Sequence, residues 1–164
     1  MGISDLPVFT IDIRHEDFDI ALEINNLKNK SFEIGAIVSF LGLVRDVSKN
    51  RELKFMEIEH YPEMTKKVLK DLCNEASTRW SLQGISIIHR IGKLYPSENI
   101  VLLIVASIHR GEAFGASEFL MDFLKSHAPF WKKETTIHGA SWIEEKEEDK
   151  QNLLRWRKVI SDPQ

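Results

Sequence analysis

The chain has 164 residues, a mass of 19.0 kDa and a formal net charge of −3, which predicts one domain that needs no disulfide or metal to stay folded. Hydrophobic residues make up 43% and charged residues 29%, which excludes a largely disordered chain. The longest apolar run, Ile100 to Ala106, is too short to cross a bilayer, and no dense stripe of lysine and arginine indicates a nucleic-acid partner. The first residues lack the features of a secretion signal and there is one cysteine, Cys73, so we expect a reducing, cytoplasmic setting and no cysteine-rich zinc site.

The first third of the chain alternates between strand and helix patterns. Residues 7–13 alternate apolar and polar side chains, which predicts a strand, and residues 17–27 repeat apolar side chains at helical spacing after an acidic first turn. Residues 34–44 are rich in β-branched side chains and predict a buried strand. Residues 53–61 alternate again, after a polar loop at 46–51. We expect these two strands to pair in antiparallel fashion, because they are close in the sequence.

The middle third carries a clear amphipathic helix over residues 62–79. Pro62 suits the first turn of a helix, and apolar side chains then recur at every fourth position. The expected buried stripe is Met64, Val68, Leu72 and Ala76, with Leu69 and Trp80 alongside. Residues 85–91 and 99–108 follow as two strands joined by a turn, and these are also expected to pair in antiparallel fashion.

The last third predicts a second amphipathic helix over 112–126, which ends before Pro129. Its expected buried stripe is Ala113, Ala116, Phe119, Leu120, Phe123 and Leu124; Met121 in this helix and Phe40 in the strand 34–44 are also expected in the core. A hairpin follows over 130–137 and 141–143, and then a tail over 144–160 that is a charged helix or a frayed extension. The order β-α-β-β-α-β-β-α-β-β predicts an α+β fold, with helices packed on a mixed, largely antiparallel sheet.

Two basic side chains, His109 and Arg110, lie where the strand 99–108 ends and the next helix is about to begin. The free N–H groups and the dipole of that helix would add to them in an anion site. The alternative is an exposed turn whose charges face water, and the residues alone leave both open. Arg45 similarly ends the strand 34–44, and it matters only if the fold brings it to the same place.

Two lysines, Lys125 and Lys132, bracket an apolar turn that contains Pro129 and Trp131. An apolar wall can desolvate an ammonium group and lower its pKa, which suits lysine to proton transfer or nucleophilic attack. The alternative for Lys125 is a lysine that complements the C-terminal dipole of its helix. Lys132 and Lys133 are adjacent on a strand, so one should point inward and the other toward solvent.

Other chemistries find little support in the residue pattern. The six histidines show no HExxH or other paired spacing, so we expect no metal site. A Gly-x-Ser-x-Gly turn is absent from the sequence, which argues against a serine hydrolase. Gly-x-Gly-x-x-Gly and P-loop motifs are also absent, which argues against a doubly wound nucleotide-binding fold.

Six segments together carry a family pattern. They are Gly35–Arg45, Glu57–Met64, Ile88–Gly92, Ser107–Arg110, Phe119–Lys125 and Ala128–Glu134. In order and spacing they resemble the large, catalytic subunit of molybdopterin synthase, and the stretch from Glu118 to Glu134 is the most specific part. This resemblance implies one catalytic domain over residues 1–145, followed by a charged helical tail over 146–164.

The resemblance implies an α/β-hammerhead fold and a sulfurtransferase activity in molybdenum cofactor biosynthesis. Such an enzyme converts cyclic pyranopterin monophosphate (precursor Z) to molybdopterin by installing two sulfurs as a dithiolene. The sulfur donor is the C-terminal Gly-Gly thiocarboxylate of a small, ubiquitin-like subunit. Two large subunits form a homodimer within a heterotetramer, and the family implies no metal or organic cofactor.

Residue roles follow from the same resemblance. Arg45, His109 and Arg110 match substrate-binding positions, where cations would hold the substrate phosphate. Lys125 matches the position regarded as essential, as general acid/base and electrostatic stabiliser, and Lys132 is a supporting catalytic cation. The substrate-binding set is completed by Leu43, Val44 and Lys133. We expect residues 45, 109–110, 125 and 132 to form a single positively charged cavity, within one chain or across neighbouring protomers.

Three positions depart from the family pattern. Leu43 stands where many relatives have Lys, His127 where Arg can occur, and Lys146 where Arg can reach a shared site. Two alternatives therefore accompany the enzyme hypothesis. One is a non-catalytic protein that keeps the fold and binds the small subunit, and the other is a phosphate-ligand binding protein without a protein sulfur donor.

Overall fold

The computed structural model describes residues 7–31, 33–48 and 51–158. In chain order the elements are β1 (Val8–Arg14), α1 (Ile20–Lys28), β2 (Ala36–Leu43), β3 (Val47–Ser48), β4 (Arg51–His60), α2 (Pro62–Arg79), β5 (Leu82–Arg90), β6 (Gly92–Leu94), β7 (Asn99–Ser107), α3 (Arg110–Ser126), β8 (Phe130–Thr136), β9 (Gly139–Trp142) and α4 (Glu147–Lys158). None of the helices in the described part of the chain is both long and apolar enough to span a membrane.

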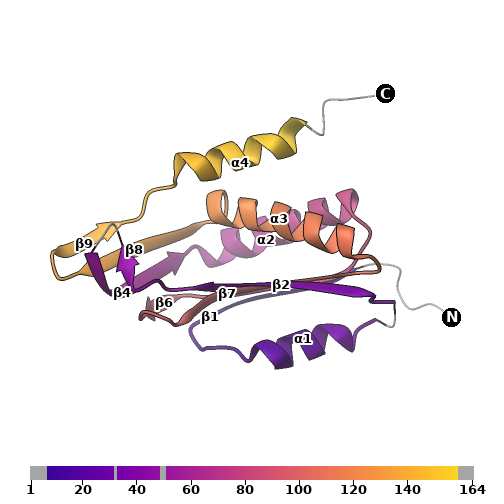
Figure 1. Cartoon of the computed structure of the whole chain (residues 1–164), viewed down its shortest axis with the longest axis horizontal. Helices are drawn as coiled ribbons and strands as arrows, with labels where there is room; N and C mark the ends of the chain where they lie inside the picture. Colours follow the sequence, from indigo (N-terminus) through magenta and orange to yellow (C-terminus); the bar gives the residue numbers. More distant parts are fainter. Residues whose placement is uncertain (1–6, 32, 49–50, 159–164) are drawn as a thin grey trace.

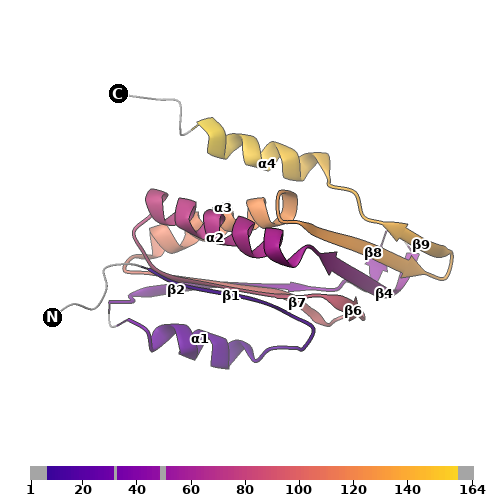
Figure 2. The same cartoon turned by 180° about the vertical axis from the view of Figure 1, so that it is seen from behind.

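The first sheet has the strand order β1-β5-β7-β2 and is covered on both faces (Figures 1 and 2). Helices α2 and α3 lie on one face and α1 lies on the other. Ile85 and Ile87 of β5 pack with the α2–α3 layer, whereas Ile88 packs with α1. A strand buried on both faces needs apolar side chains on both, which explains the unbroken apolar run from Ile100 to Ala106 in β7.

The pairing confirms the predicted α+β fold with a mixed, largely antiparallel sheet. β1 and β5 are parallel, whereas β5–β7 and β7–β2 are antiparallel, so the prediction for 85–91 and 99–108 is confirmed. The predicted pairing of 34–44 with 53–61 is wrong, since β2 pairs with β7 and β4 pairs with β8. β4 alternates buried Ile58 with exposed Glu59, a pattern that suits a sheet with one solvated face.

The second sheet has the order β3-β4-β8-β9, with β6 also paired to β4, and it extends from one end of the first sheet (Figure 1). In the antiparallel β4–β8 pair, Ile58 lies opposite Lys132 and His60 lies opposite Phe130. β3 and β6 have only 2 and 3 residues, too few to show a period in the sequence. β3 falls inside the predicted polar loop 46–51.

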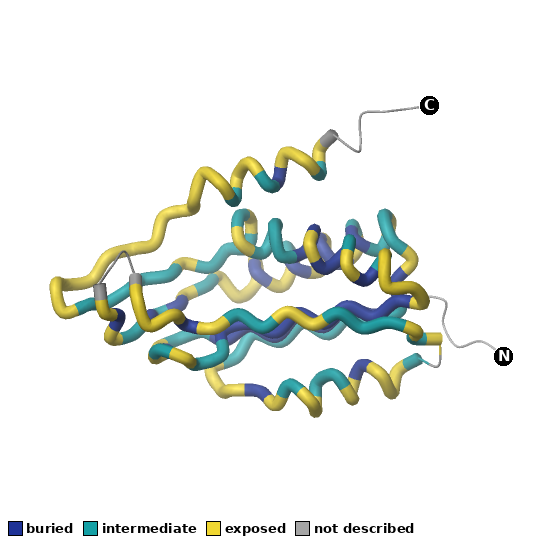
Figure 3. The backbone as a smooth tube through the Cα atoms, in the orientation of Figure 1, coloured by how far each residue is buried: buried dark blue, intermediate teal, exposed yellow. Residues whose placement is uncertain are grey.

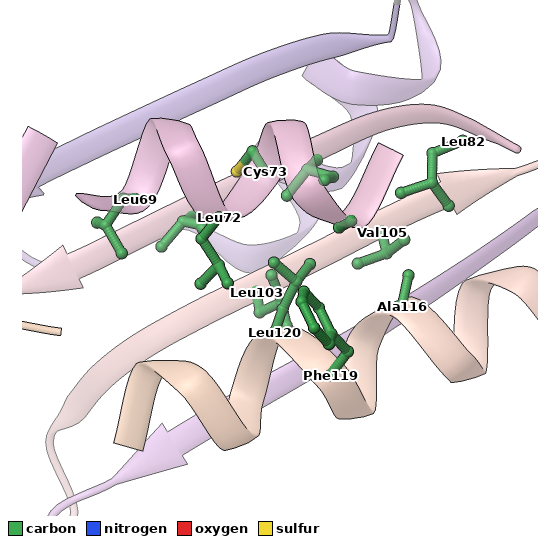
Figure 4. Packing of buried hydrophobic residues seen from close by; sticks show 12 residues of the cluster. Leu69, Leu72, Cys73, Leu82, Leu103, Val105, Ala116, Phe119 and Leu120 are labelled. Atoms are coloured by element: carbon green, nitrogen blue, oxygen red, sulfur yellow. The ribbon is translucent and has the colours of Figure 1, made fainter. Parts of the chain in front are cut away.

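The main core lies between α2, α3 and the first sheet, where buried residues gather (Figures 3 and 4). The expected α3 stripe is confirmed, and Met121 packs against this core. Three expectations are wrong. The strand 34–44 was expected to be buried, but the residues of β2 are partly buried or exposed because β2 is an outer strand. Met64 is 56% exposed, because α2 turns Thr65 and Cys73 inward beside the expected Leu69, Leu72 and Ala76. Phe40 is 39% exposed on the outer strand β2.

The predicted helical tail is confirmed as α4, which packs outside α3 (Figure 1). Leu153 is 5% exposed, and Trp156 packs against the core through Trp80 and Phe119. Residues 159–160 of the predicted helix lie outside the described residues. The proposed domain boundary at 145–146 stays a prediction, although α4 shares a core with the rest of the chain.

Candidate active site

Helix α3 separates the predicted site residues into two groups. Arg110 begins this helix and Lys125 lies in its last turn. Because each residue of an α-helix advances 1.5 Å, the 17 residues of α3 place its ends about 25 Å apart. The expectation that residues 45, 109–110, 125 and 132 share one cavity is therefore wrong within a single chain.

The first group, His109 and Arg110, lies at the start of α3, beside the beginning of β2. Both side chains are exposed. The backbone is fixed here, because the Gly35 N–H donates to the Ser107 carbonyl at 3.0 Å and the Ser107 hydroxyl donates to the His109 carbonyl. A Cβ atom at Gly35 would lie 2.2 Å from the Ile108 carbonyl oxygen, so only glycine allows this close approach.

The second group lies at the opposite end of α3, where β2 ends and β7 begins. Leu43 pairs with Asn99 at that end, whereas Ala36 pairs with Ser107 at the other. Arg45 and Leu43 are exposed, and Leu43 is 49% exposed. The geometry thus places Arg45 at the same end of the molecule as the two lysines.

Val44, between these residues, is 2% exposed. Its N–H donates to the Glu98 carbonyl at 2.9 Å, and its own carbonyl accepts from the Ser97 N–H at 2.8 Å. Both backbone groups are therefore used within the chain. Of the predicted substrate-binding turn, the side chains of Leu43 and Arg45 are the parts that face outward.

Lys125 and Lys132 lie on either side of the turn between α3 and β8, and the charge of Lys125 acts on Lys132. Lys125 is exposed, while Lys132 is partly buried on β8 opposite Ile58. Burial, and next the positive charge of Lys125, lower the pKa of Lys132, while Asp149 acts in the opposite direction. The apolar surroundings expected at this turn therefore lower the pKa of Lys132.

Lys133 lies on the other side of β8, as alternation along a strand requires. Its ammonium group is 5.6 Å from the centroid of the Trp142 ring on β9, and the side chain is partly buried. Lys132 and Lys133 thus occupy different environments, and the aromatic ring of Trp142 faces Lys133.

Two neighbours of Lys132 were not expected from the sequence. His89 of β5 is 4% exposed and stacks on Phe130, with ring centroids 3.8 Å apart and an interplanar angle of 10°. Burial, and next the charge of Lys132, lower the pKa of His89 to about 3. Asp149 of α4 is the other neighbour. Both lie far from Lys132 in the chain, so no local motif could have indicated them.

The structure also has a cavity, which lies away from the predicted site residues. A cavity of about 320 Å³ lies at the junction of α1 and β2 and is lined by Lys28, Ser31, Ile34, Gly35, Ala36 and Ile37. None of the predicted site residues lines it. Over residues 7–31, 33–48 and 51–158, no cluster of three or more His, Cys, Asp or Glu side chains is arranged to hold a metal ion.

Comparison with known proteins identifies the family. The family described as MoaE protein matches residues 13–127 of the chain. The chain belongs to the MoaE family. It is 50% identical to the molybdopterin synthase catalytic subunit of Ralstonia nicotianae over 153 residues. The matched residues make up 93% of this chain and 86% of that protein.

Solved MoaE-family structures share the fold. The molybdopterin biosynthesis MoaE protein from Burkholderia ambifaria superposes with a TM-score of 0.79 at 42% identity, covering 92% of this chain and 99% of that one. The molybdopterin synthase structure from Staphylococcus aureus gives 0.75 at 32% identity, covering 81% and 96%. These matches place both groups of basic residues on a MoaE-type framework, while their individual roles stay predictions.

Proposed function

We propose that this chain is the catalytic subunit of a molybdopterin synthase, which transfers sulfur to precursor Z from the thiocarboxylated tail of a small ubiquitin-like subunit. The observation that carries the proposal is the 50% identity, over 93% of the chain, to a protein of that name. The name of that relative, a catalytic subunit, itself implies at least one further subunit. The cations Arg45, Lys125 and Lys132 at one end of α3 support the same activity.

The chemistry asks for fixed positive charge and for proton transfer. In each sulfur transfer a carbon–sulfur bond forms on the pterin side chain while a carbon–oxygen bond at the same carbon breaks, and the displaced oxygen takes up a proton and leaves as water or stays on the phosphate. Water then cleaves the acyl–sulfur bond and leaves a carboxylate on the donor tail. Arg45 suits bidentate contact with the substrate phosphate. Lys125 stabilises the developing negative charge and exchanges a proton. Lys132, whose pKa is lowered by burial and by Lys125, supports it as a second cation.

A homodimer would bring the two basic groups together. β2 is the outer strand of the first sheet and exposes Phe40 and Leu43. If the β2 strands of two copies pair in antiparallel fashion about a two-fold axis, the start of one strand meets the end of the other. His109 and Arg110 of one protomer would then lie near Lys125 of its partner. The proposed active site is thus built from two chains.

The activity is tested with purified chain, thiocarboxylated small subunit and precursor Z, by measuring the molybdopterin that is formed. We expect product with the wild type and its loss in Lys125→Ala. The control is Lys70→Ala, which removes an exposed lysine from α2. Absence of product with the wild type would overturn the enzyme hypothesis, and undiminished product with Lys125→Ala would overturn the role of Lys125.

The two-chain site is tested by mixing two inactive variants, Arg110→Ala and Lys125→Ala. In a mixed dimer one site receives Lys125 from the first chain and Arg110 from the second, so both residues are present. Random mixing of equal amounts then restores about a quarter of the wild-type sites. No recovery on mixing, with both variants folded and dimeric, would place the site within one chain.

A second candidate function keeps the fold without turnover, as a protein that binds a phosphate ligand or the small subunit. The observation that favours it is that Leu43 is 49% exposed beside Arg45, at a position where the family resemblance leads us to expect a lysine for the phosphate site. Calorimetry with precursor Z and with the small subunit separates the candidates. Binding without product supports this function, while multiple turnover excludes it.

A further inference from the structure

The carboxylate of Asp122 on α3 anchors the C-terminal helix. Arg155 donates to it from Nη2 at 2.5 Å and from Nε at 3.2 Å, and the indole N–H of Trp156 donates at 2.7 Å. Arg155 also pairs with Glu118 at 3.0 Å, one turn earlier on α3. We call these contacts of Arg155 and Trp156 with Asp122 and Glu118 the α4 clamp.

Apolar packing supports the clamp. The ring centroid of Trp156 lies 5.4 Å from that of Phe119 and 5.8 Å from that of Trp80. Arg79 of α2 donates to the Trp156 carbonyl at 3.3 Å. The second half of α4 is therefore seated on both α2 and α3, and this fixes the direction in which the first half of the helix runs.

The first turn of α4 lies against the lysine end of α3. There the Ser126 hydroxyl donates to the Asp149 carbonyl at 3.3 Å. The charges of Asp149 on α4 and of Lys125 on α3 act on Lys132, and the charge of Lys132 acts in turn on His89 of β5. On β4 its direct partner is apolar Ile58, and His60 follows two residues later. Asp149 is the carboxylate that α4 contributes to this group, and Glu134 lies two residues along β8 from Lys132.

We propose that α4 is a positioning element for the lysine site, in which the clamp holds Asp149 as the counter-charge of Lys132. Asp149 is a positioning residue, since it acts through Lys132. This proposal rests on the proposed function only in assigning Lys132 a part in the reaction.

The physical reason is the unequal balance of charge around Lys132. Burial disfavours an ammonium group and a second ammonium nearby repels it. One carboxylate offsets both effects only while it stays close, since Coulomb attraction falls with distance and rises in a low-polarity setting. The position of α4 therefore sets the fraction of Lys132 that carries a proton.

The test measures the titration of Lys132 directly. Lysines of the purified full-length chain are reductively methylated with ¹³C and followed by NMR against pH, with the Lys132 signal assigned by Lys132→Arg. We expect Asp149→Asn to shift the Lys132 titration to lower pH. The matched control, Glu148→Gln, removes an exposed neighbouring carboxylate and should leave it nearly unchanged. No shift in Asp149→Asn, or an equal shift in the control, would overturn the proposal.

The clamp is tested with Arg155→Gln. Loss of a positive charge alone moves a nearby lysine titration to higher pH, so a shift to lower pH would indicate displacement of Asp149. Trp156→Phe, which keeps an aromatic ring and loses the N–H donor, should act in the same direction and guards against misfolding of the first variant. Asp149→Asn combined with Arg155→Gln should shift no further than Asp149→Asn. A shift to higher pH in both clamp variants would refute the clamp.

The same variants separate this proposal from the proposed function. Their pH–rate profiles for molybdopterin formation should move with the Lys132 titration. If the titration moves and the profile does not, Asp149 positions Lys132 as proposed and Lys132 has no part in proton transfer. If the titration stays in place, the positioning proposal fails whatever the activity.

Discussion

Acidification should destabilise this protein largely through the imidazole of His89. The side chain is 4% exposed and stacked on Phe130. Its Nδ1 lies 2.8 Å from the Arg90 carbonyl oxygen, a contact in which the ring nitrogen must donate. Burial and the nearby charge of Lys132 lower the pKa of His89 from 6.5 to about 3 in the folded chain.

The sign and size of the effect follow from proton linkage. Between pH 6.5 and 3 the unfolded chain binds a proton at His89 that the folded chain does not, so the free energy of unfolding falls as the pH falls through this window. Within this window each pH unit changes the free energy of unfolding by about 1.36 kcal/mol. From pH 7.0 to 4.5 the loss attributable to His89 is therefore about 2.5 kcal/mol. Asp17, whose pKa is lowered mainly by its hydrogen bond from Asn99, loses its contribution at lower pH.

Urea unfolding followed by circular dichroism at pH 7.0 and 4.5 measures this loss. His89→Phe keeps a ring against Phe130 and cannot take up a proton. It should cost about 1–2 kcal/mol at pH 7.0 through the lost hydrogen bond. Between pH 7.0 and 4.5 the free energy of unfolding of His89→Phe should then fall by about 2.5 kcal/mol less than that of the wild type. His138→Phe, in an exposed turn, is the control and should keep the wild-type loss. Equal losses in His89→Phe and wild type would refute the reasoning.

Three other predictions concern stability and reactivity. Phe119→Ala, at a side chain with 0% exposure that contacts several rings, should cost about 3–5 kcal/mol in urea unfolding; a loss below 1 kcal/mol would contradict the packing described. Gly35→Ala should cost about 1–3 kcal/mol, because the new methyl group meets the Ile108 backbone. Gly111→Ala, where the described chain leaves open space, is its control, and equal effects would refute the close approach. Cys73 is buried and its pKa is raised to about 12 by burial, so the native thiol should resist an aromatic disulfide reagent and react once urea unfolds the chain. Fast reaction in native buffer would contradict this.

Local sequence determined most of the elements and the outline of the fold. The helices 62–79 and 112–126 were predicted because a 3.6-residue period marks one face of a helix wherever that face is buried. The apolar run Ile100 to Ala106 lies in the predicted strand 99–108, which is confirmed as β7. Family motifs in addition indicated the MoaE-type activity, before any arrangement in space was known.

The local sequence did not determine which strands pair with one another. Only the short strand β3 separates β2 from β4 along the chain, yet β2 pairs with β7 and β4 pairs with β8, because pairing depends on how the whole chain packs and not on closeness in the sequence. The same limit explains Phe40: its apolar side chain suits a core, and only the position of β2 at the edge of the sheet exposes it.

The candidate active site shows most clearly what the sequence and the tertiary structure each determined. The sequence by itself selected Arg45, Arg110, Lys125 and Lys132 as the residues with suitable chemistry, since residue type and motif are local properties. Only the tertiary structure separated Arg110 from Lys125 by the length of α3, and only it placed His89 and Asp149 around Lys132. Charge and desolvation act through space over a few ångströms, and the neighbours of Lys132 come from β5, α3 and α4, which the chain brings together only on folding.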